Sequence, residues 1–204
     1  MHHVISRGNN KEYLFHSEED FLYYINLLEH ARKIYPINIY NFVLMDNHIH
    51  LLVEPKGDAH LAKVMEIVTK GYAKYFNKKN GRTGHVFEGR YKSFLVQEER
   101  YFFVCSRYID FNPVKSGQVQ EPREYKWSGY RHLAYGEGLP LEMNQHTLYE
   151  QLGSNDMERQ IGYRAVVAHI TEELDLLDKR TRILGDKAFK KEVKSNNMTL
   201  VGNK

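Results

Sequence analysis

The amino-acid sequence predicts an α+β fold, a ferredoxin-like β-α-β-β-α-β antiparallel sheet followed by one further helix and a helical C-terminal extension. Two observations carry this prediction. Short runs rich in β-branched and aromatic residues alternate with longer segments whose apolar residues recur every three or four positions. These segments follow the order strand, helix, strand, strand, helix, strand, and turn residues or a proline separate them. We therefore expect the first two helices to cover one face of the sheet.

The first predicted elements are a strand over residues 3–6 and a helix that ends near Ile34. Ser17 and Asp20 have the spacing of a capping box, in which two side chains satisfy backbone N–H groups at the start of a helix. Apolar residues keep helical spacing behind this box, and Pro36 prevents the helix from continuing.

A predicted hairpin carries a pair of histidines. Residues 37–45 and 48–53 are rich in β-branched and aromatic residues, and a two-residue turn joins them. Because side chains alternate along a strand, His48 and His50 point to the same face of the sheet. Two imidazoles that converge from one strand suit a divalent cation. Taken alone, such a pair is more often structural or solvent-facing.

The second helix and the connection behind it are basic. Asp58 is a candidate N-cap for a helix over residues 61–76, and residues 80–81 end that helix. Residues 82–91 form a Gly-rich connection. Between residues 63 and 92 there are eight basic side chains and two acidic ones, an excess that can hold a phosphate backbone. Without a catalytic site nearby, a solvated helix face is the simpler interpretation.

A tyrosine lies one helical turn before an asparagine near the end of the predicted core. Residues 94–96 are predicted as the fourth strand and residues 98–111 as a helix. Residues four apart share a helix face, so Tyr108 and Asn112 project together. Pro113 marks the end of this helix. A histidine pair, a tyrosine hydroxyl and a nearby amide can together make a metal-assisted phosphoryl-transfer site.

The C-terminal part of the chain is less regular. A boundary near Gly136 divides the whole chain into domains over residues 1–135 and 136–204. Trp127 and Arg131 lie in a segment that mixes aromatic and basic residues, which either stacks bases and binds phosphates or packs its tryptophan on the core. The helices predicted for the extension cover residues 145–153 and 155–180, with a last short one from residue 184.

Composition narrows the class of protein. The chain has 204 residues, 42% of them hydrophobic and 27% charged, which is ordinary for a globular protein. Its single cysteine excludes an internal disulfide. The start has no signal-peptide pattern, and no apolar run is long enough to span a bilayer, so we expect a cytoplasmic protein with no membrane partner. The net charge of +3 by itself says little about nucleic acid.

Two segments together resemble the HUH single-tyrosine transposases, and more closely the REP-associated tyrosine transposases. Residues 47–52, Asn-His-Ile-His-Leu-Leu, match the His-hydrophobic-His motif of that family, and residues 107–117 match its catalytic-helix segment. Residues 84–92 are similar to the loop before that helix, and the resemblance covers about residues 2–135. It implies a ferredoxin-like fold and a DNA-associated protein that cleaves single-stranded DNA next to a hairpin.

The resemblance also implies the roles of the site residues. Carried over by position, Tyr108 is the nucleophile, and His48, His50 and Asn112 are ligands of a divalent ion, Mg or Mn. Attack by the tyrosine would form a 5′-phosphotyrosine and free a 3′-hydroxyl, which stores the bond for later strand joining. Tyr101 is the alternative nucleophile, but only Tyr108 has a ligand candidate at the fourth residue after it. The residues expected to bind DNA are Arg90, Lys92, Lys115, Trp127 and Arg131.

Three functions remain open from sequence. The first is a single-strand DNA nicking and joining enzyme, a transposase or a domesticated processor of REP hairpins. The second is a DNA-hairpin-binding protein that does not cut. The third is a metal-dependent hydrolase without a covalent step, although no His-Glu-x-x-His or Walker A pattern supports a metalloprotease or an NTPase. The extension can bind hairpin DNA, brace the catalytic helix or cover the site, and the chain can be a monomer or a homodimer.

Overall fold

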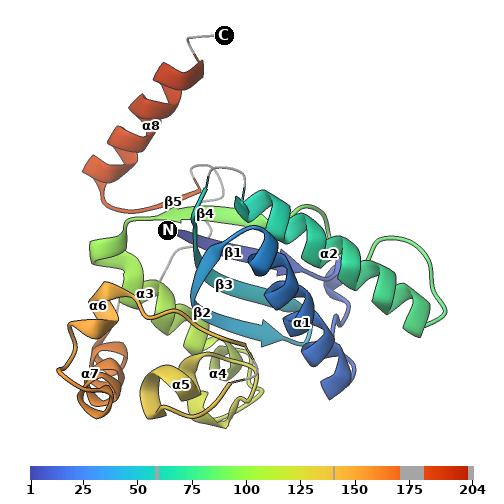
Figure 1. Cartoon of the computed structure of the whole chain (residues 1–204), viewed down its shortest axis with the longest axis horizontal. Helices are drawn as coiled ribbons and strands as arrows, with labels where there is room; N and C mark the ends of the chain where they lie inside the picture. Colours follow the sequence, from blue (N-terminus) through green and yellow to red (C-terminus); the bar gives the residue numbers. More distant parts are fainter. Residues whose placement is uncertain (58–59, 140, 171–181, 202–204) are drawn as a thin grey trace.

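A five-stranded sheet with helices on both faces forms the body of the computed structural model, which describes residues 1–57, 60–139, 141–170 and 182–201 (Figure 1). The strand order is β2-β3-β1-β4-β5, and the strands are β1 (His2–Arg7), β2 (Ile37–Met45), β3 (His48–Pro55), β4 (Lys92–Val96) and β5 (Ile183–Leu184). The helices are α1 (Glu18–Ile34), α2 (His60–Lys79), α3 (Glu98–Asp110), α4 (Asn112–Lys115), α5 (Tyr130–Tyr135), α6 (Thr147–Glu150), α7 (Asp156–His169) and α8 (Lys187–Val201).

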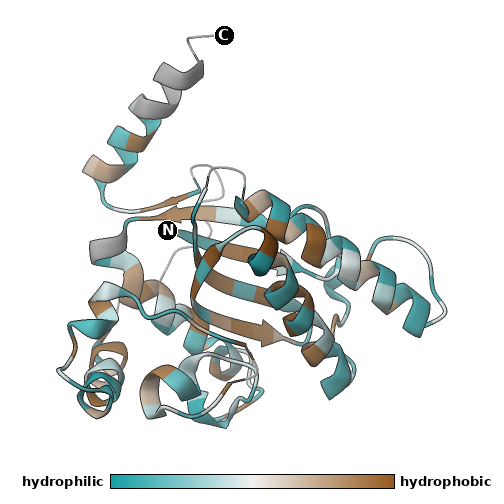
Figure 2. Cartoon of the chain, in the orientation of Figure 1, coloured by the Kyte–Doolittle hydropathy of each residue, from teal (hydrophilic) through white to brown (hydrophobic). Residues whose placement is uncertain are grey.

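The predicted ferredoxin-like sheet is confirmed for its first four strands. β1 pairs antiparallel with β3 and β4, and β2 pairs antiparallel with β3 through the predicted hairpin. α1 and α2 pack together on one face, and α3 contacts β2 and β3 from the other (Figure 1). β2 and β3 are largely hydrophobic because both of their faces are covered (Figure 2). Because β2 and β1 flank it, the histidine-bearing strand β3 is an interior strand of the sheet.

The sheet has a fifth strand that the sequence did not predict. β5 comes from the C-terminal extension and pairs parallel to β4, with Leu95 opposite Ile183 and Val96 opposite Leu184. A two-residue strand is too short to show a periodic pattern, which is why the sequence predicted the start of a helix at residue 184. The helix α8 starts at Lys187 instead.

The other predicted helices are confirmed with shifted ends. α6 and α7 lie within the predicted ranges 145–153 and 155–180, of which residues 171–181 lie outside the described part of the chain. The proposed N-cap Asp58 also lies outside it. The helix predicted over residues 98–111 ends at Asp110, because Phe111 leaves helical geometry (φ −90°, ψ 1°) before α4 begins. In the ranges that the structure covers, no helix has the length and apolar character needed to cross a membrane.

The outer edge of β2 is covered by chain from beyond the ferredoxin-like core. Leu44 N–H donates to the Trp127 carbonyl at 2.9 Å, and Gly129 N–H donates to the Phe42 carbonyl at 2.9 Å. Asn144 continues this cover near the other end of the strand, where its backbone N–H donates to the Ile39 carbonyl at 2.7 Å. Backbone groups of Ile39, Phe42 and Leu44 on this edge are thus satisfied within the same chain.

The start of α1 is held by a buried carboxylate. The predicted capping box is present, and Asp20 Oδ2 accepts the backbone N–H groups of His16 at 2.8 Å and Ser17 at 3.0 Å. Asp20 Oδ1 accepts from Lys79 Nζ at 2.7 Å and from the Tyr75 hydroxyl at 2.9 Å. Burial alone would raise the pKa of Asp20, but these donors outweigh it and hold the pKa below its ordinary value. Asp20 therefore joins α1 to α2.

Replacing Asp20 with asparagine is expected to lower the free energy of unfolding at neutral pH by about 2 kcal/mol, because charge-assisted hydrogen bonds are lost. A lowered native pKa stabilises the fold above the unfolded-state value of about 3.9 and stops doing so as pH falls through the native value. The difference between wild type and D20N in urea unfolding should therefore shrink below about pH 4. Glu19→Gln is the control, since Glu19 binds the same Lys79 at 2.9 Å from an exposed position. A difference that is constant with pH would contradict this account.

Candidate functional site

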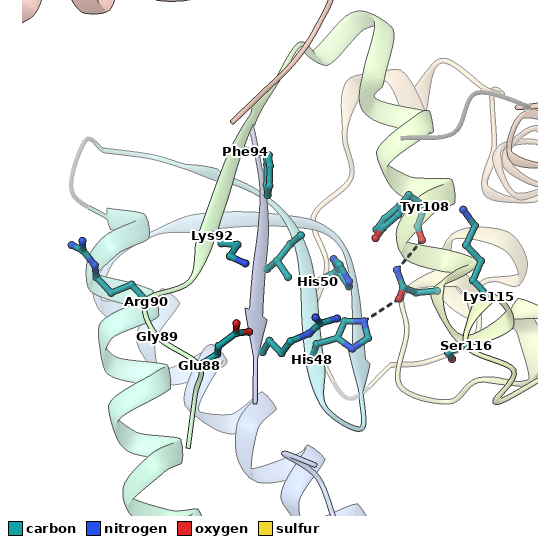
Figure 3. Close-up of a pocket in the computed structure, with 13 residues that line it drawn as sticks. His48, His50, Glu88, Gly89, Arg90, Lys92, Phe94, Tyr108, Lys115 and Ser116 are labelled. Atoms are coloured by element: carbon teal, nitrogen blue, oxygen red, sulfur yellow. Dashed lines mark hydrogen bonds between the residues drawn. The ribbon is translucent and has the colours of Figure 1, made fainter. Parts of the chain in front are cut away.

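A cavity of about 480 Å³ opens on the α3 face of the sheet (Figure 3). His48 and His50 line it from β3, Tyr108 from α3 and Asn112 from α4. These are the four residues that the sequence predicts as the catalytic and metal-binding set. The structure therefore brings all four to one place, although Asn112 begins a new helix instead of continuing that of Tyr108.

His48 is held between two amides. Its Nδ1 lies 2.7 Å from Asn47 Oδ1, and its Nε2 lies 3.0 Å from Asn112 Oδ1. Both partner atoms are amide oxygens that can only accept, and a neutral ring carries one proton, so His48 donates either to Asn47 from Nδ1 or to Asn112 from Nε2. Burial lowers the pKa of His48, although the Asn112 contact opposes this, and the neutral form is the one that binds metals. When Nδ1 carries the proton, the Nε2 lone pair and Asn112 Oδ1 face each other, as two ligands of one ion would.

His50 is buried and touches a third histidine that the sequence did not single out. His50 Nδ1 lies 2.9 Å from His3 Nε2, and the two rings stack with centroids 5.1 Å apart. Burial, and then the neighbouring rings, hold the pKa of His50 well below its ordinary value. Burial lowers the pKa of His3 to about 3. The alternation of β1 places His3 on the site face, but only the β1–β3 register brings it to His50.

Tyr108 packs its ring against both buried histidines. The ring centroid lies 5.4 Å from that of His50 and 5.7 Å from that of His3, each in an edge-on arrangement. Lys115 Nζ lies 5.5 Å from the centroid of the same ring. Burial raises the pKa of Tyr108, while the Asn112 side chain and the charge of Arg7 act in the opposite direction. The nearby positive charge of Arg7 therefore opposes the effect of burial on the pKa of Tyr108.

The walls of the cavity are cationic. Arg90, Lys92 and Lys115, three of the predicted DNA-binding residues, line it, and so does Arg7. The sequence did not single out Arg7, although it lies four residues after His3 on the same strand face. The connection over residues 82–91 runs beside the end of β1, where the N–H of Glu88 donates to the Arg7 carbonyl at 2.9 Å. Glu88 is the acidic side chain among the lining residues.

The other two predicted DNA-binding residues lie elsewhere. Trp127 is 8% exposed and stacks on Phe21, with ring centroids 4.5 Å apart and planes inclined by 1°. Arg131 forms an ion pair with Glu137 and does not line the cavity. The tryptophan is therefore packed on the core, as the second of the two interpretations expects.

The donor set fits a divalent ion that keeps part of its water shell. In the described ranges no three His, Cys, Asp or Glu side chains converge to hold a metal, so the amide of Asn112 is the third protein donor available to the histidine pair. The 3.0 Å between His48 Nε2 and Asn112 Oδ1 equals the spacing of neighbouring ligands around an octahedral ion with bonds of about 2.1 Å. Imidazole nitrogen and amide oxygen are both ligand types that divalent metal ions accept.

The end of α3 is fixed by a buried polar network. Asp110 accepts from the Tyr163 hydroxyl at 2.5 Å and from Asn41 Nδ2 at 2.9 Å. Asn41 lies at the register shift of β2, which turns its side chain toward α3. Burial raises the pKa of Asp110 to about 7, and the two donors oppose the rise. Tyr163 comes from α7, so the C-terminal extension is bound to the helix that carries Tyr108.

Comparisons with known proteins give a family and a similar fold. The family model described as "Transposase IS200 like" matches residues 1–112. The solved structure of a REP-associated tyrosine transposase bound to a REP hairpin is similar, with a TM-score of 0.51 and 17% sequence identity over 71% of this chain and 84% of that one. At that identity the likeness shows the fold alone. A search of curated protein sequences finds no match.

Proposed function

The chain belongs to the IS200-like transposase family, and from this premise we propose that it nicks and rejoins single-stranded DNA beside a hairpin, with Tyr108 as the nucleophile. The observation that carries the proposal is the convergence of Tyr108, His48, His50 and Asn112 in one cationic cavity. The hairpin in the similar solved structure supports the same class of substrate for this chain. The proposal makes the protein DNA-associated and metal-dependent.

The chemical step is a phosphoryl transfer to the phenol. Tyr108 Oη would lose its proton and bond to phosphorus, and the bond from phosphorus to the 3′ oxygen would break. The downstream strand would then be held as a 5′-phosphotyrosine, and the upstream strand would leave with a 3′-hydroxyl after taking up a proton. Attack by a 3′-hydroxyl on the phosphotyrosine would reverse the step and join two strands, so no ATP is needed.

The residues around Tyr108 would lower the energy of the phenolate and orient the phosphate. Arg7 already acts to lower the pKa of Tyr108, and the Lys115 ammonium lies over its ring. His48, His50 and Asn112 would hold Mg or Mn, which when bound supplies Lewis-acid stabilisation of the charge that develops on the phosphoryl oxygens. The position of these three ligands beside the ring supports attack at a phosphate in this cavity.

We further propose that residues 1–135 carry the chemistry and that residues 136–204 brace the catalytic helix. The four site residues all lie in the first segment. The bond from Tyr163 to Asp110 joins the second segment to the end of α3, two residues after Tyr108. This contact favours the bracing role among the three left open for the extension.

The test is covalent trapping on a hairpin oligonucleotide with a single-stranded flank, labelled at either end. With Mn or Mg, the 3′-labelled fragment is expected to migrate with the protein on a denaturing gel, and the 5′-labelled fragment is expected to be free with a 3′-hydroxyl. EDTA should abolish both products. Cleavage with no label on the protein would indicate a hydrolase. Tight hairpin binding without cleavage, on flanks from the gene's own surroundings, would indicate a binding protein.

Arg90 is expected to contact the DNA backbone, because it lines both the catalytic cavity and a second cavity of about 620 Å³ that contains Lys70 and Arg182. Arg90→Ala should weaken hairpin binding to a similar degree across sequences and reduce the slope of log affinity against log salt by about 0.7 to 0.9. Lys126→Ala is the control, since this exposed lysine pairs with Glu18 and lines neither cavity. If the slope of log affinity against log salt were equal for R90A and wild type, Arg90 would not contact the DNA backbone.

A further inference from the structure

His3 is a buried histidine beside the proposed metal ligands. It is 0% exposed, lies on β1 and faces α3, and its Nε2 contacts His50 Nδ1 at 2.9 Å. Its other ring nitrogen, Nδ1, is buried and has no hydrogen-bond partner. An unsatisfied buried polar atom costs about 1–3 kcal/mol, so a structural role alone does not explain a histidine at this position.

The contact between the two rings restricts where their protons lie. Two neutral imidazoles share one proton across the 2.9 Å contact, so one nitrogen donates and the other accepts. If His50 Nδ1 donates, its Nε2 has a lone pair and can bind a cation. If His3 Nε2 donates, His50 must carry its own proton on Nε2 and cannot bind one.

His48 shows the same pattern with a different partner. Asn47 Oδ1 lies 2.7 Å from His48 Nδ1 and is its acceptor when the ring proton is on Nδ1, the form in which the Nε2 lone pair is free for a cation. Metal-binding histidines generally donate their second N–H to such a partner, which fixes both the tautomer and the ring orientation. His50 has His3 in the place that Asn47 takes for His48.

We propose that His3 is a positioning residue, which accepts the Nδ1 proton of His50 and so keeps His50 Nε2 unprotonated and directed at the cavity. In this arrangement His3 carries its own proton on the unpartnered Nδ1. The inference rests on the proposed function, because it gives His50 the role of metal ligand. It extends the site to a strand that the His-Ile-His segment does not include.

The test combines two readouts on three variants. His3→Phe keeps an aromatic ring against Tyr108 but removes the acceptor, and His3→Gln restores an acceptor. His2→Phe is the matched control, because His2 lies on the opposite face of β1 and contacts Ser93 Oγ at 2.9 Å. The first readout is Mn²⁺ affinity without DNA, from the EPR signal of free Mn²⁺. The second is the tautomer of His50 in the metal-free protein, from the nitrogen-15 shifts of its ring.

In wild type, His50 is expected to show a protonated Nδ1 and an unprotonated Nε2. His3→Phe should lower Mn²⁺ affinity about 10- to 100-fold and mix the tautomers of His50. His3→Gln should stay within a few-fold of wild type, and His2→Phe should match it. An Nε2-protonated His50 in wild type, or unchanged affinity and tautomer in His3→Phe, would overturn the inference.

The tautomer readout separates this inference from the proposed function. If wild type bound no Mn²⁺ and formed no DNA adduct, the proposed function would fail, yet the nitrogen-15 shifts would still show whether His3 sets the tautomer of His50. If His3→Phe does not fold, His3→Gln and the wild-type spectrum decide the question.

Discussion

Replacing Tyr108 with phenylalanine is expected to abolish the protein–DNA adduct and to lower cleavage at least about 10³-fold, because removing a covalent nucleophile leaves only binding and electrostatic stabilisation. Phenylalanine keeps the ring that packs on His50 and His3, so the fold and the hairpin affinity should stay near those of wild type. The measurement is adduct formation on a labelled hairpin oligonucleotide, with affinity measured in parallel.

Tyr101→Phe is the matched control for this experiment. Tyr101 lies two turns earlier on α3, is partly buried, and does not line the cavity. The Tyr101→Phe variant should form the adduct at the wild-type rate. An adduct that forms in Y108F but not in Y101F would identify Tyr101 as the nucleophile. Cleavage that neither change affects would indicate hydrolysis without a covalent intermediate.

Replacing His48 with alanine is expected to weaken Mn²⁺ binding by more than about 100-fold. Loss of a residue that only supports a ligand costs about 10- to 100-fold, and loss of the ligand itself should cost more. Cleavage should fall with metal affinity, and raising the Mn²⁺ concentration should recover part of it. The measurements are Mn²⁺ affinity without DNA and the rate of adduct formation across a Mn²⁺ titration.

His60→Ala is the control for His48, because it removes a partly buried imidazole on α2 that does not line the cavity and contacts the Pro36 carbonyl at 3.1 Å. It should change neither metal affinity nor cleavage. Equal Mn²⁺ affinity in H48A and wild type would place the metal away from β3. Lower affinity with an unchanged adduct rate would mean that the metal is bound at this site but not needed for the chemical step.

Local sequence patterns were sufficient to predict the elements that carry the site. Strand alternation places His48 and His50 on one face, and four-residue spacing places Asn112 near Tyr108 even though Phe111 interrupts the helix. Both rules act within a few residues of chain, so they do not depend on tertiary structure. The roles of these four residues stay predictions until they are tested.

The features that local patterns missed depend on register or on distant contacts. His3 reaches His50 only through the pairing of β1 with β3, and Arg7 reaches the cavity by the same pairing. Asn41 meets Asp110 because β2 has an irregular register, and the partner Tyr163 is 53 residues away from Asp110 in the chain. Such contacts are set by packing of the whole fold, and a single sequence holds no short-range signal for them.

The strip of backbone that covers β2 bears on how two copies of this protein could meet. An open edge strand is a template on which a second chain can extend the sheet. Here the edge of β2 already bonds to Trp127, Gly129 and Asn144 of its own chain, and β5 occupies part of the edge of β4. A continuous sheet shared by two copies through β2 would first have to displace that strip. This arrangement favours the monomer over an edge-joined homodimer, and a monomer would carry all four predicted site residues within one chain.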